Sequence, residues 1–188
     1  MKEIEILIEV KNDLVTALKA LESFESHGMK ETLDIYFKDR LREDLQPDPQ
    51  GRLTNALRLR QKGDKSYITH KQDHFDDMLN WTHSDELETE IPSFGTVHNI
   101  FMHLGLEELV RVETKKYIFT TQDYEIVLEE VTDLGLFLEV EKMTQVSDDE
   151  VARTKEEIRS FINTLDIEFG EEQNAGKPEL LLRKKLIV

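Results

Sequence analysis

The sequence predicts an α+β protein in which helices pack against one face of an antiparallel sheet of seven or eight strands. Apolar and charged side chains alternate through several segments, which is typical of half-buried strands. Turn residues separate neighbouring segments of this kind and indicate hairpins. Three further segments repeat apolar residues at helical spacing and are long enough to cover the apolar faces of the strands.

The first expected strand covers residues 3–11, with three isoleucines and a valine on one face and mostly charged side chains on the other. Asn12 can cap a following helix that ends at Gly28 and covers the isoleucine face. Residues 31–37 form the next expected strand.

A hairpin with positively charged side chains is expected in the middle of the chain, turning at Gly63. Its strands place Arg58, Arg60 and Lys71 on polar faces, so this part of the sheet presents cations. The next expected elements are an irregular polar segment, a strand and a helix: residues 72–85, 86–91 and 93–104. Trp81 in the irregular segment is either a loop anchor or an aromatic residue that faces a substrate.

The last hairpin, residues 127–141, presents carboxylates. Phe137, Glu139 and Glu141 share one face of its second strand, and Glu129 on the first strand can join them. Neighbouring strands that both present carboxylates repel each other unless something positive lies between them. The flanking expected elements are a strand, a helix and a tail whose end fits an edge strand or a helix: residues 108–119, 147–165 and 170–188.

Composition excludes several classes of function. A formal net charge of −16 disfavours nucleic acid and anionic membrane surfaces as partners. The absence of cysteine excludes disulfides, thiolate metal sites and cysteine nucleophiles. The charged, alternating N-terminus does not resemble a signal peptide, and no apolar run approaches the roughly 18 residues of a membrane span. We therefore expect a cytoplasmic protein.

The charged strand faces allow two interpretations. They could be the solvated side of an ordinary antiparallel sheet. They could instead turn inward and line a tunnel, which the sorting of the charges favours because one hairpin gives cations and others give glutamates. Guanidinium groups bind phosphate oxygens and carboxylates bind Mg²⁺ or Mn²⁺, so such a tunnel would suit a polyphosphate with a divalent metal.

Several short charged motifs follow one another along the chain: Glu9-Val10-Lys11, Leu57-Arg58-Leu59-Arg60, Lys71, Glu88 with Glu90, Lys116, Glu129, and Gly135 with Phe137, Glu139 and Glu141. In this order, from about residue 3 to residue 182, the chain resembles the CYTH superfamily. These triphosphate tunnel metalloenzymes include class IV adenylyl cyclases, thiamine triphosphatases and inorganic triphosphatases, and their motifs include ExExK, LRxR, RxExE, KxR and GxFxExE.

The resemblance implies a single tunnel domain, residues 1–182, formed by eight antiparallel strands with a charged interior and helices outside, followed by a basic and apolar tail, residues 183–188. It implies that triphosphate is bound by Lys11, Arg58, Arg60, Lys71 and Lys116. It implies that Mg²⁺ or Mn²⁺ is held, or water positioned, by Glu9, Glu88, Glu90, Glu129, Glu139 and Glu141. Glu9 and Lys11 are the expected catalytic residues, and the chain could form a homodimer.

The chain also departs from the family motifs. Leu7 stands where the first glutamate of ExExK belongs, Glu86 where the arginine of RxExE belongs, and Thr114 where the lysine of KxR belongs. Near the C-terminus, Gly176 and Lys177 replace a Ser-Tyr pair. Because leucine at position 7 supplies no carboxylate, a second metal ion would lack one of its ligands. The absence of two cations should weaken triphosphate binding. Glu86 and Glu125 are expected to be surface or structural charges.

Three functions fit these observations. The first is metal-dependent hydrolysis of inorganic triphosphate or of a nucleoside or other organic triphosphate. The second is an adenylyl cyclase that forms cyclic AMP and pyrophosphate from ATP. The third is a module that binds polyphosphate or nucleotide without turnover, as the departures at Leu7, Glu86 and Thr114 suggest.

Overall fold

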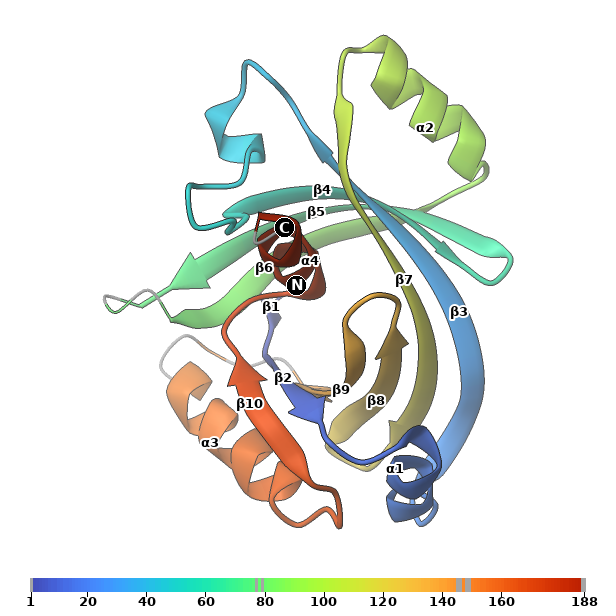
Figure 1. Cartoon of the computed structure of the whole chain (residues 1–188), viewed down its shortest axis with the longest axis vertical. Coiled ribbons are helices and arrows are strands. Elements are labelled where there is room, and N and C mark those ends of the chain that lie inside the picture. The colour runs from blue at the N-terminus through green and yellow to red at the C-terminus, as the bar shows by residue number, and fades with distance from the viewer. Residues whose placement is uncertain (1, 77, 79, 145–146, 148–149, 187–188) are drawn as a thin grey trace.

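The strands form one antiparallel sheet that curls around a central space, as the computed structural model shows (Figure 1). The structure describes residues 2–76, 78, 80–144, 147 and 150–186. The strands are β1 (Lys2–Glu3), β2 (Glu5–Val10), β3 (Glu25–Lys38), β4 (Asn55–Lys62), β5 (Lys65–Phe75), β6 (Trp81–Ile91), β7 (Glu107–Thr120), β8 (Tyr124–Val131), β9 (Gly135–Lys142) and β10 (Phe169–Gln173). The helices are α1 (Leu14–Ala20), α2 (Phe94–His103), α3 (Val151–Ile162) and α4 (Lys177–Leu186), with a 3₁₀ turn at Glu43–Leu45.

The N-terminal segment closes the sheet into a ring. In the described residues the order is β1-β6-β5-β4-β3-β7-β8-β9-β2-β10. Because β1 leads into β2 after Ile4, one segment pairs with β6 at its start and with β9 along the rest. Counted as one strand, residues 2–10 complete a ring of eight strands, and β10 lies outside it on β2. The predicted α+β tunnel of eight antiparallel strands is therefore confirmed.

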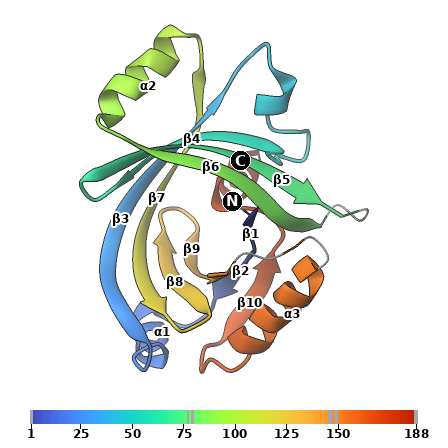
Figure 2. The same cartoon turned by 180° about the vertical axis from the view of Figure 1, so that it is seen from behind.

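Three helices cover the outer, apolar face of the ring. The alternating face predicted for residues 3–11 packs Ile4, Ile6 and Val10 into one core with Ile158 of α3 and Ala17 of α1. At the other side of the ring, α2 packs Phe101 against Phe37 and Leu59 of β3 and β4. Figure 2 shows α2 separated from α1 and α3 by the length of the ring. The polar strand faces therefore point inward, as the tunnel interpretation requires.

The fourth helix lies in the space enclosed by the strands, where both views place it (Figures 1 and 2). Leu181 of α4 packs with Leu7, Tyr36, Leu53 and Val112 in a core on the inner face. The expectation that all helices lie outside is thus wrong for α4. This helix also runs through residue 183, where the sequence suggested the start of a tail.

Two expected boundaries are also wrong. The helix predicted to end at Gly28 stops at Ala20, and β3 already begins at Glu25. Gly28 has a φ of 81°, within a register shift between Ser26 and Met29, so its conformational freedom serves a bulge in β3 and not a helix end.

The segment predicted to be irregular, residues 72–85, mostly belongs to strands. β5 extends to Phe75 and β6 begins at Trp81, with Asp73 opposite Ser84 and His74 opposite His83. The segment was not predicted as strands because its side chains are polar. These side chains form hydrogen bonds between β5 and β6, as Ser84 Oγ does by donating to Asp73 Oδ1 over 2.5 Å. Within the described part of the chain, no helix is long and apolar enough to cross a membrane.

Candidate functional site

The inner face of the ring encloses a cavity of about 240 Å³ with a wall of mixed charge. Four of the five predicted phosphate ligands line it: Arg58, Arg60, Lys71 and Lys116. Three of the predicted metal ligands also line it: Glu88, Glu139 and Glu141. Side chains from all parts of the ring therefore meet in one space.

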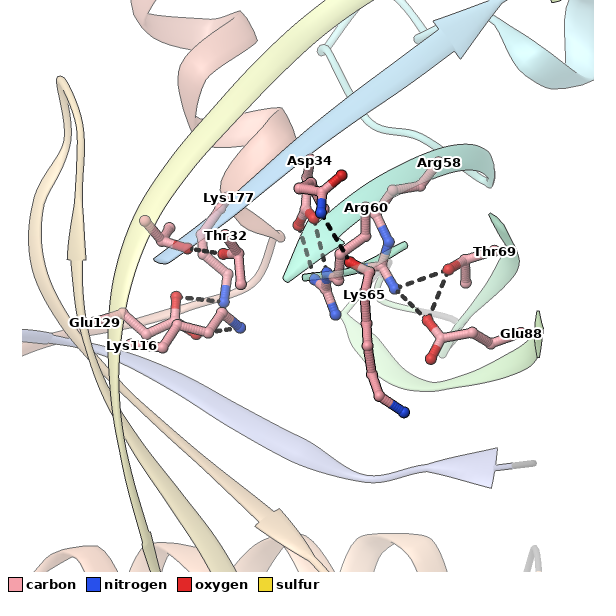
Figure 3. A network of polar contacts seen from close by, with 12 residues as sticks. Thr32, Asp34, Arg58, Arg60, Lys65, Thr69, Glu88, Lys116, Glu129 and Lys177 are labelled. Carbon is pink, nitrogen blue, oxygen red and sulfur yellow. Dashed lines mark hydrogen bonds and ion pairs between the residues drawn. The ribbon is translucent and has the colours of Figure 1, made fainter. Parts of the chain in front are cut away.

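An arginine wall, which we define as Asp34, Arg58, Arg60, Thr69 and Glu88, forms the part of the cavity built by β3 to β6 (Figure 3). Register places Arg58 beside Thr69 and Thr69 beside Glu88, and Arg60 beside Asp34. Arg60 donates two hydrogen bonds of 2.7 Å to the Asp34 carboxylate. Burial acts to raise the pKa of Asp34, but Arg60 holds that pKa well below its usual range.

The guanidinium of Arg58 is incompletely paired. Its Nη2 donates to Thr69 Oγ1 over 3.2 Å and to Glu88 Oε2 over 3.3 Å. Its Nε is buried and has no hydrogen-bond partner among the described residues. A buried donor without an acceptor costs about 1–3 kcal/mol. An anionic ligand in the cavity would supply the missing acceptor.

A lysine–glutamate cluster, which we define as Lys116, Glu129, Glu139 and Lys177, is joined by ion pairs. Figure 3 shows Lys116, Glu129 and Lys177 across the cavity from the arginine wall. Glu129 has no exposed surface, and its two oxygens lie 2.7 Å from Lys116 Nζ and 2.7 Å from Lys177 Nζ. Lys177 Nζ also donates to Glu139 Oε2. Burial acts to lower the pKa of Lys177, but Glu129 and Glu139 hold that pKa well above its usual range.

A carboxylate row, which we define as Glu5, Glu125 and Glu141, follows one register line across β8, β9 and β2. Glu125 lies opposite Glu141, and Glu141 lies opposite Glu5. All three line the cavity and are half-buried. Like charges directly opposite each other destabilise a sheet. The donor chemistry of this row therefore fits a hard divalent cation.

Four predicted residues do not line the cavity, although one of them, Glu129, contacts Lys116 and Lys177, which do. Glu9 and Lys11 pair with each other at 2.6 Å, with side chains 38% and 47% exposed, and neither lines the cavity. Glu90 lies beyond the cavity end of β6 and pairs with Lys65 at 3.0 Å. Glu9, Lys11 and Glu90 therefore lie past the strand positions that face the cavity.

Sequence reasoning missed several residues of the cavity. Asp34 could have been found, because it alternates with Thr32 and Tyr36 on one face of β3. Glu5 could have been found by placing the ExExK motif at Glu3, Glu5 and Leu7, which leaves leucine at the lysine position.

Two further residues share strand faces with predicted ligands, Glu86 with Glu88 and Glu125 with Glu129, so alternation places them on the same side. Glu86 and Glu125 were expected to be surface or structural charges, and both line the cavity.

Trp81 also lines the cavity and is 8% exposed, and Lys71 Nζ, another lining group, lies 5.7 Å from the centroid of its ring. Glu179 of α4 is buried there, and burial together with Asp73 raises its pKa to about 7.

A histidine group lies apart from this cavity. His74 Nε2 is 2.8 Å from Asp85 Oδ2, and the His74 and His83 rings stack with centroids 4.5 Å apart. In the described residues, it is the group in which three ligand atoms lie within 4.8 Å of one another. His74 and Asp85 alternate with the cavity residues Asp73 and Glu86, so the group occupies the other face of β5 and β6.

Comparison with known proteins agrees with this architecture. The chain is 31% identical over 166 residues to a Methanocaldococcus jannaschii protein named "Putative adenylate cyclase MJ0240", covering 88% of this chain and 89% of that protein. The solved structure of the PH1819 protein from Pyrococcus horikoshii superposes with a TM-score of 0.80 at 26% identity, covering 97% of this chain and 99% of that one.

A more distant structure shares the fold. It is named "Putative adenylyl cyclase HpAC1" from Hippeastrum, is described as having a dominant triphosphatase activity, and has a TM-score of 0.65 at 16% identity, covering 97% of this chain and 95% of that one. The model of the CYTH domain matches residues 1–171. The chain therefore belongs to the CYTH domain family.

Proposed function

We propose that this chain is a divalent-metal-dependent triphosphatase that hydrolyses inorganic triphosphate or an organic triphosphate inside the ring. The observation that carries the proposal is the buried, unpaired Nε of Arg58 in a cavity that also presents Arg60, Lys71 and Lys116. A triphosphate offers several anionic oxygens to such donors, and guanidinium groups bind them with charge-assisted hydrogen bonds.

Each part of the cavity has a role in this proposal. Arg58 and Lys71 bind phosphate oxygens, and Asp34 fixes the plane of the Arg60 guanidinium. The carboxylate row, with Glu88 from the arginine wall, would hold Mg²⁺ or Mn²⁺, which when bound neutralises phosphate charge and polarises the phosphoryl group. Positioning and charge neutralisation supply most of the catalysis of phosphoryl transfer, so these residues suffice for hydrolysis by water.

The cavity size favours a substrate of which mainly the phosphates enter. Its volume of about 240 Å³ lies below the roughly 300–1,000 Å³ of sites that enclose drug-sized ligands. Trp81 narrows one side, with Lys71 Nζ 5.7 Å and Lys155 Nζ 4.7 Å from its ring centroid. Inorganic triphosphate, or the phosphate chain of a larger molecule, fits this space better than a whole nucleotide.

The test is the release of phosphate, pyrophosphate and cyclic AMP from tripolyphosphate and from ATP, with Mg²⁺ or Mn²⁺. Wild type should release phosphate, and at subsaturating substrate Arg58→Ala should release it roughly ten- to a hundredfold more slowly. The matched control is Arg153→Ala, because Arg153 is an exposed arginine of α3 whose side chain is 79% exposed. Equal rates for wild type and Arg58→Ala would refute the role of the arginine wall.

Adenylyl cyclase activity is the second candidate, because the relative named as an adenylate cyclase is 31% identical over most of the chain. If the assay yields cyclic AMP and pyrophosphate from ATP, the chain is a cyclase and the hydrolysis proposal is wrong. Binding of tripolyphosphate in a thermal shift assay, with no product from either substrate, would identify a non-catalytic triphosphate binder.

A further inference from the structure

The histidine group, which we define as His74, His83 and Asp85, lies on the outer face of β5 and β6, apart from the cavity. Register places His74 directly opposite His83, and Asp85 follows two residues later on the same face of β6. His74 Nε2 lies 2.8 Å from Asp85 Oδ2, and one potential ligand atom of each residue lies within 4.8 Å of the others. Two imidazoles and a carboxylate are a ligand set that divalent transition metals use in proteins.

The hydrogen bonds of Thr82 assign the proton of the neutral His83 ring. Thr82 Oγ1 donates to the His74 carbonyl oxygen over 3.0 Å, so its single hydroxyl proton is already used. Thr82 Oγ1 also lies 3.1 Å from His83 Nδ1, and in this contact it must accept. His83 Nδ1 therefore carries the ring proton, and Nε2 has the lone pair that a metal ion requires.

This arrangement is typical of metal-binding histidines, in which the second ring nitrogen donates to an oxygen that orients the ring. Here that oxygen is Thr82 Oγ1, and its own hydrogen bond to the His74 carbonyl fixes its direction. Thr82 thus connects the backbone of one histidine to the ring of the other. The two histidines are positioned as a unit.

The backbone spacing suits a metal ion, and the side chains need a small rearrangement. Residues directly opposite each other on antiparallel strands have Cβ atoms about 4.5–5.5 Å apart, which two imidazoles can span around one ion. Zinc bonds of about 2.0–2.1 Å place tetrahedral ligand atoms roughly 3.4 Å apart. The two rings stack with an interplanar angle of 7°, so they must rotate to face a common ion. The side chains of His74 and Asp85 are 38% and 55% exposed, which leaves room for this rotation.

The donors have contacts of their own, which an ion would replace in part. His74 Nε2 and Asp85 Oδ2 are joined by a hydrogen bond, so a proton lies between them. When a metal ion binds, this proton moves to His74 Nδ1 or to water, and both atoms become ligands. The ion then joins the same two residues that the proton joined before.

We propose that His74, His83 and Asp85 bind a Zn²⁺ ion that links β5 and β6 where β5 ends and β6 begins. Imidazole ligands suit Zn²⁺, whereas the carboxylates of the cavity suit the hard ions Mg²⁺ and Mn²⁺. The ion would hold together strand ends that also carry Asp73 and Trp81, which line the cavity. The inference goes beyond the proposed function and does not depend on it.

The test is calorimetric titration with Zn²⁺ in excess Mg²⁺, supported by absorption spectroscopy with Co²⁺ as a substitute for zinc. Wild type should bind one Zn²⁺ ion more tightly than any other. Loss of an outer-shell partner typically costs about 10–100-fold in affinity, so His74→Gln and His83→Gln should each weaken this site at least roughly tenfold. The control is His103→Gln, which changes an exposed histidine of α2 and should bind Zn²⁺ as wild type does.

Thr82 gives a second set of variants that leaves all three ligands in place. Thr82→Val removes the oxygen that accepts from His83 Nδ1 and should weaken Zn²⁺ binding roughly tenfold. Thr82→Ser keeps a hydroxyl at this position and should restore the wild-type affinity. Equal affinity of Thr82→Val and wild type would contradict the assigned proton of His83.

The outcomes separate this inference from the proposed function, because none of them involves triphosphate. Unchanged Zn²⁺ affinity in both histidine variants, or an equal loss in His103→Gln, overturns the inference. A measurement on wild type needs no variant that folds. In crystals grown with Zn²⁺, the anomalous scattering peak at the zinc absorption edge should lie within bonding distance of His74 and His83. A peak confined to the cavity would overturn the inference.

Discussion

The two charged regions of the cavity are built differently. Each region holds two cations and two anions. In the arginine wall, Arg58 Nε is a buried donor without a hydrogen-bond partner in the part of the chain that the structure describes. In the lysine–glutamate cluster, all four charged groups are joined in one network of ion pairs, in which Glu129 Oε1, also without a hydrogen bond there, lies 2.7 Å from Lys116 Nζ. A region with spare donors is prepared for a ligand, whereas a neutral, buried network mainly determines how the surrounding elements pack. The comparison predicts that mutations in the cluster affect stability and mutations in the wall affect turnover.

The largest effect is expected at Glu129. Glu129→Ala leaves Lys116 without its carboxylate and Lys177 with one carboxylate fewer, and breaking a buried ion pair typically costs about 3–5 kcal/mol. Urea denaturation should show a loss of this size in the free energy of unfolding. Glu130→Ala is the matched control, because Glu130 is the next residue along β8 and its side chain is 51% exposed. Equal losses for the two variants would contradict the distinction between the regions.

The next effect concerns Glu179, which holds α4 and hence Lys177 in place. Its pKa of about 7 lies above the 4.5 of the free side chain, so the folded state binds the proton more tightly than the unfolded state. Protonation of Glu179 makes its full contribution to the free energy of unfolding below pH 4.5, and this contribution is lost as the pH rises through 7. Wild type should therefore lose roughly 3 kcal/mol between pH 4.5 and pH 8 through this group.

Glu179→Gln removes this dependence while keeping the oxygen that accepts from the Leu53 amide. The free energy of unfolding of the variant, relative to wild type, should rise by that amount between pH 4.5 and pH 8, as measured by urea denaturation at several pH values. Glu22→Gln, which changes an exposed carboxylate, should follow the wild-type curve. If Glu179→Gln also followed that curve, the carboxyl of Glu179 would titrate normally.

A somewhat smaller effect is expected at the arginine wall. Arg58→Ala removes one charge-assisted contact to phosphate, worth about 1.5–3 kcal/mol, or roughly ten- to a hundredfold in tripolyphosphate affinity. Calorimetric titration with tripolyphosphate measures this directly. The free energy of unfolding should change less than in Glu129→Ala. A large loss of stability with unchanged affinity would reverse the roles given to the two regions.

The sequence allowed much of the ring to be predicted because its strands alternate. The segment 127–141 places Leu138 and Val140 in the outer core and Glu139 and Glu141 at the cavity, as the pattern of side chains predicts. The boundary at Gly28 could not be predicted, because a glycine with positive φ serves equally well at a helix end and at a bulge. Only pairing of β3 with β7, far away in the sequence, selects the bulge.

The contribution of α4 could not be predicted, because nothing in its own pattern shows that it enters the ring. Lys177 was noticed only as a departure from a family motif, and its partners Glu129 and Glu139 lie 48 and 38 positions away. The position of ExExK was also ambiguous. Glu9 and Lys11 match two of its letters, whereas Glu5 is in register with Glu141 at the cavity.

The smallest effect is expected for variants that test which residues form the ExExK motif. The double variant Glu9→Gln/Lys11→Ala removes an exposed ion pair that is worth at most about 1 kcal/mol in stability. Because neither side chain lines the cavity, the rate of triphosphate hydrolysis and the Mn²⁺ affinity should stay within about twofold of wild type. Glu5 lies four residues before Glu9 on the same strand. Glu5→Gln should weaken Mn²⁺ binding because it removes a carboxylate from the row. If the double variant lost metal binding and Glu5→Gln kept it, the motif would begin at Leu7 after all, and the carboxylate row would not be the metal site.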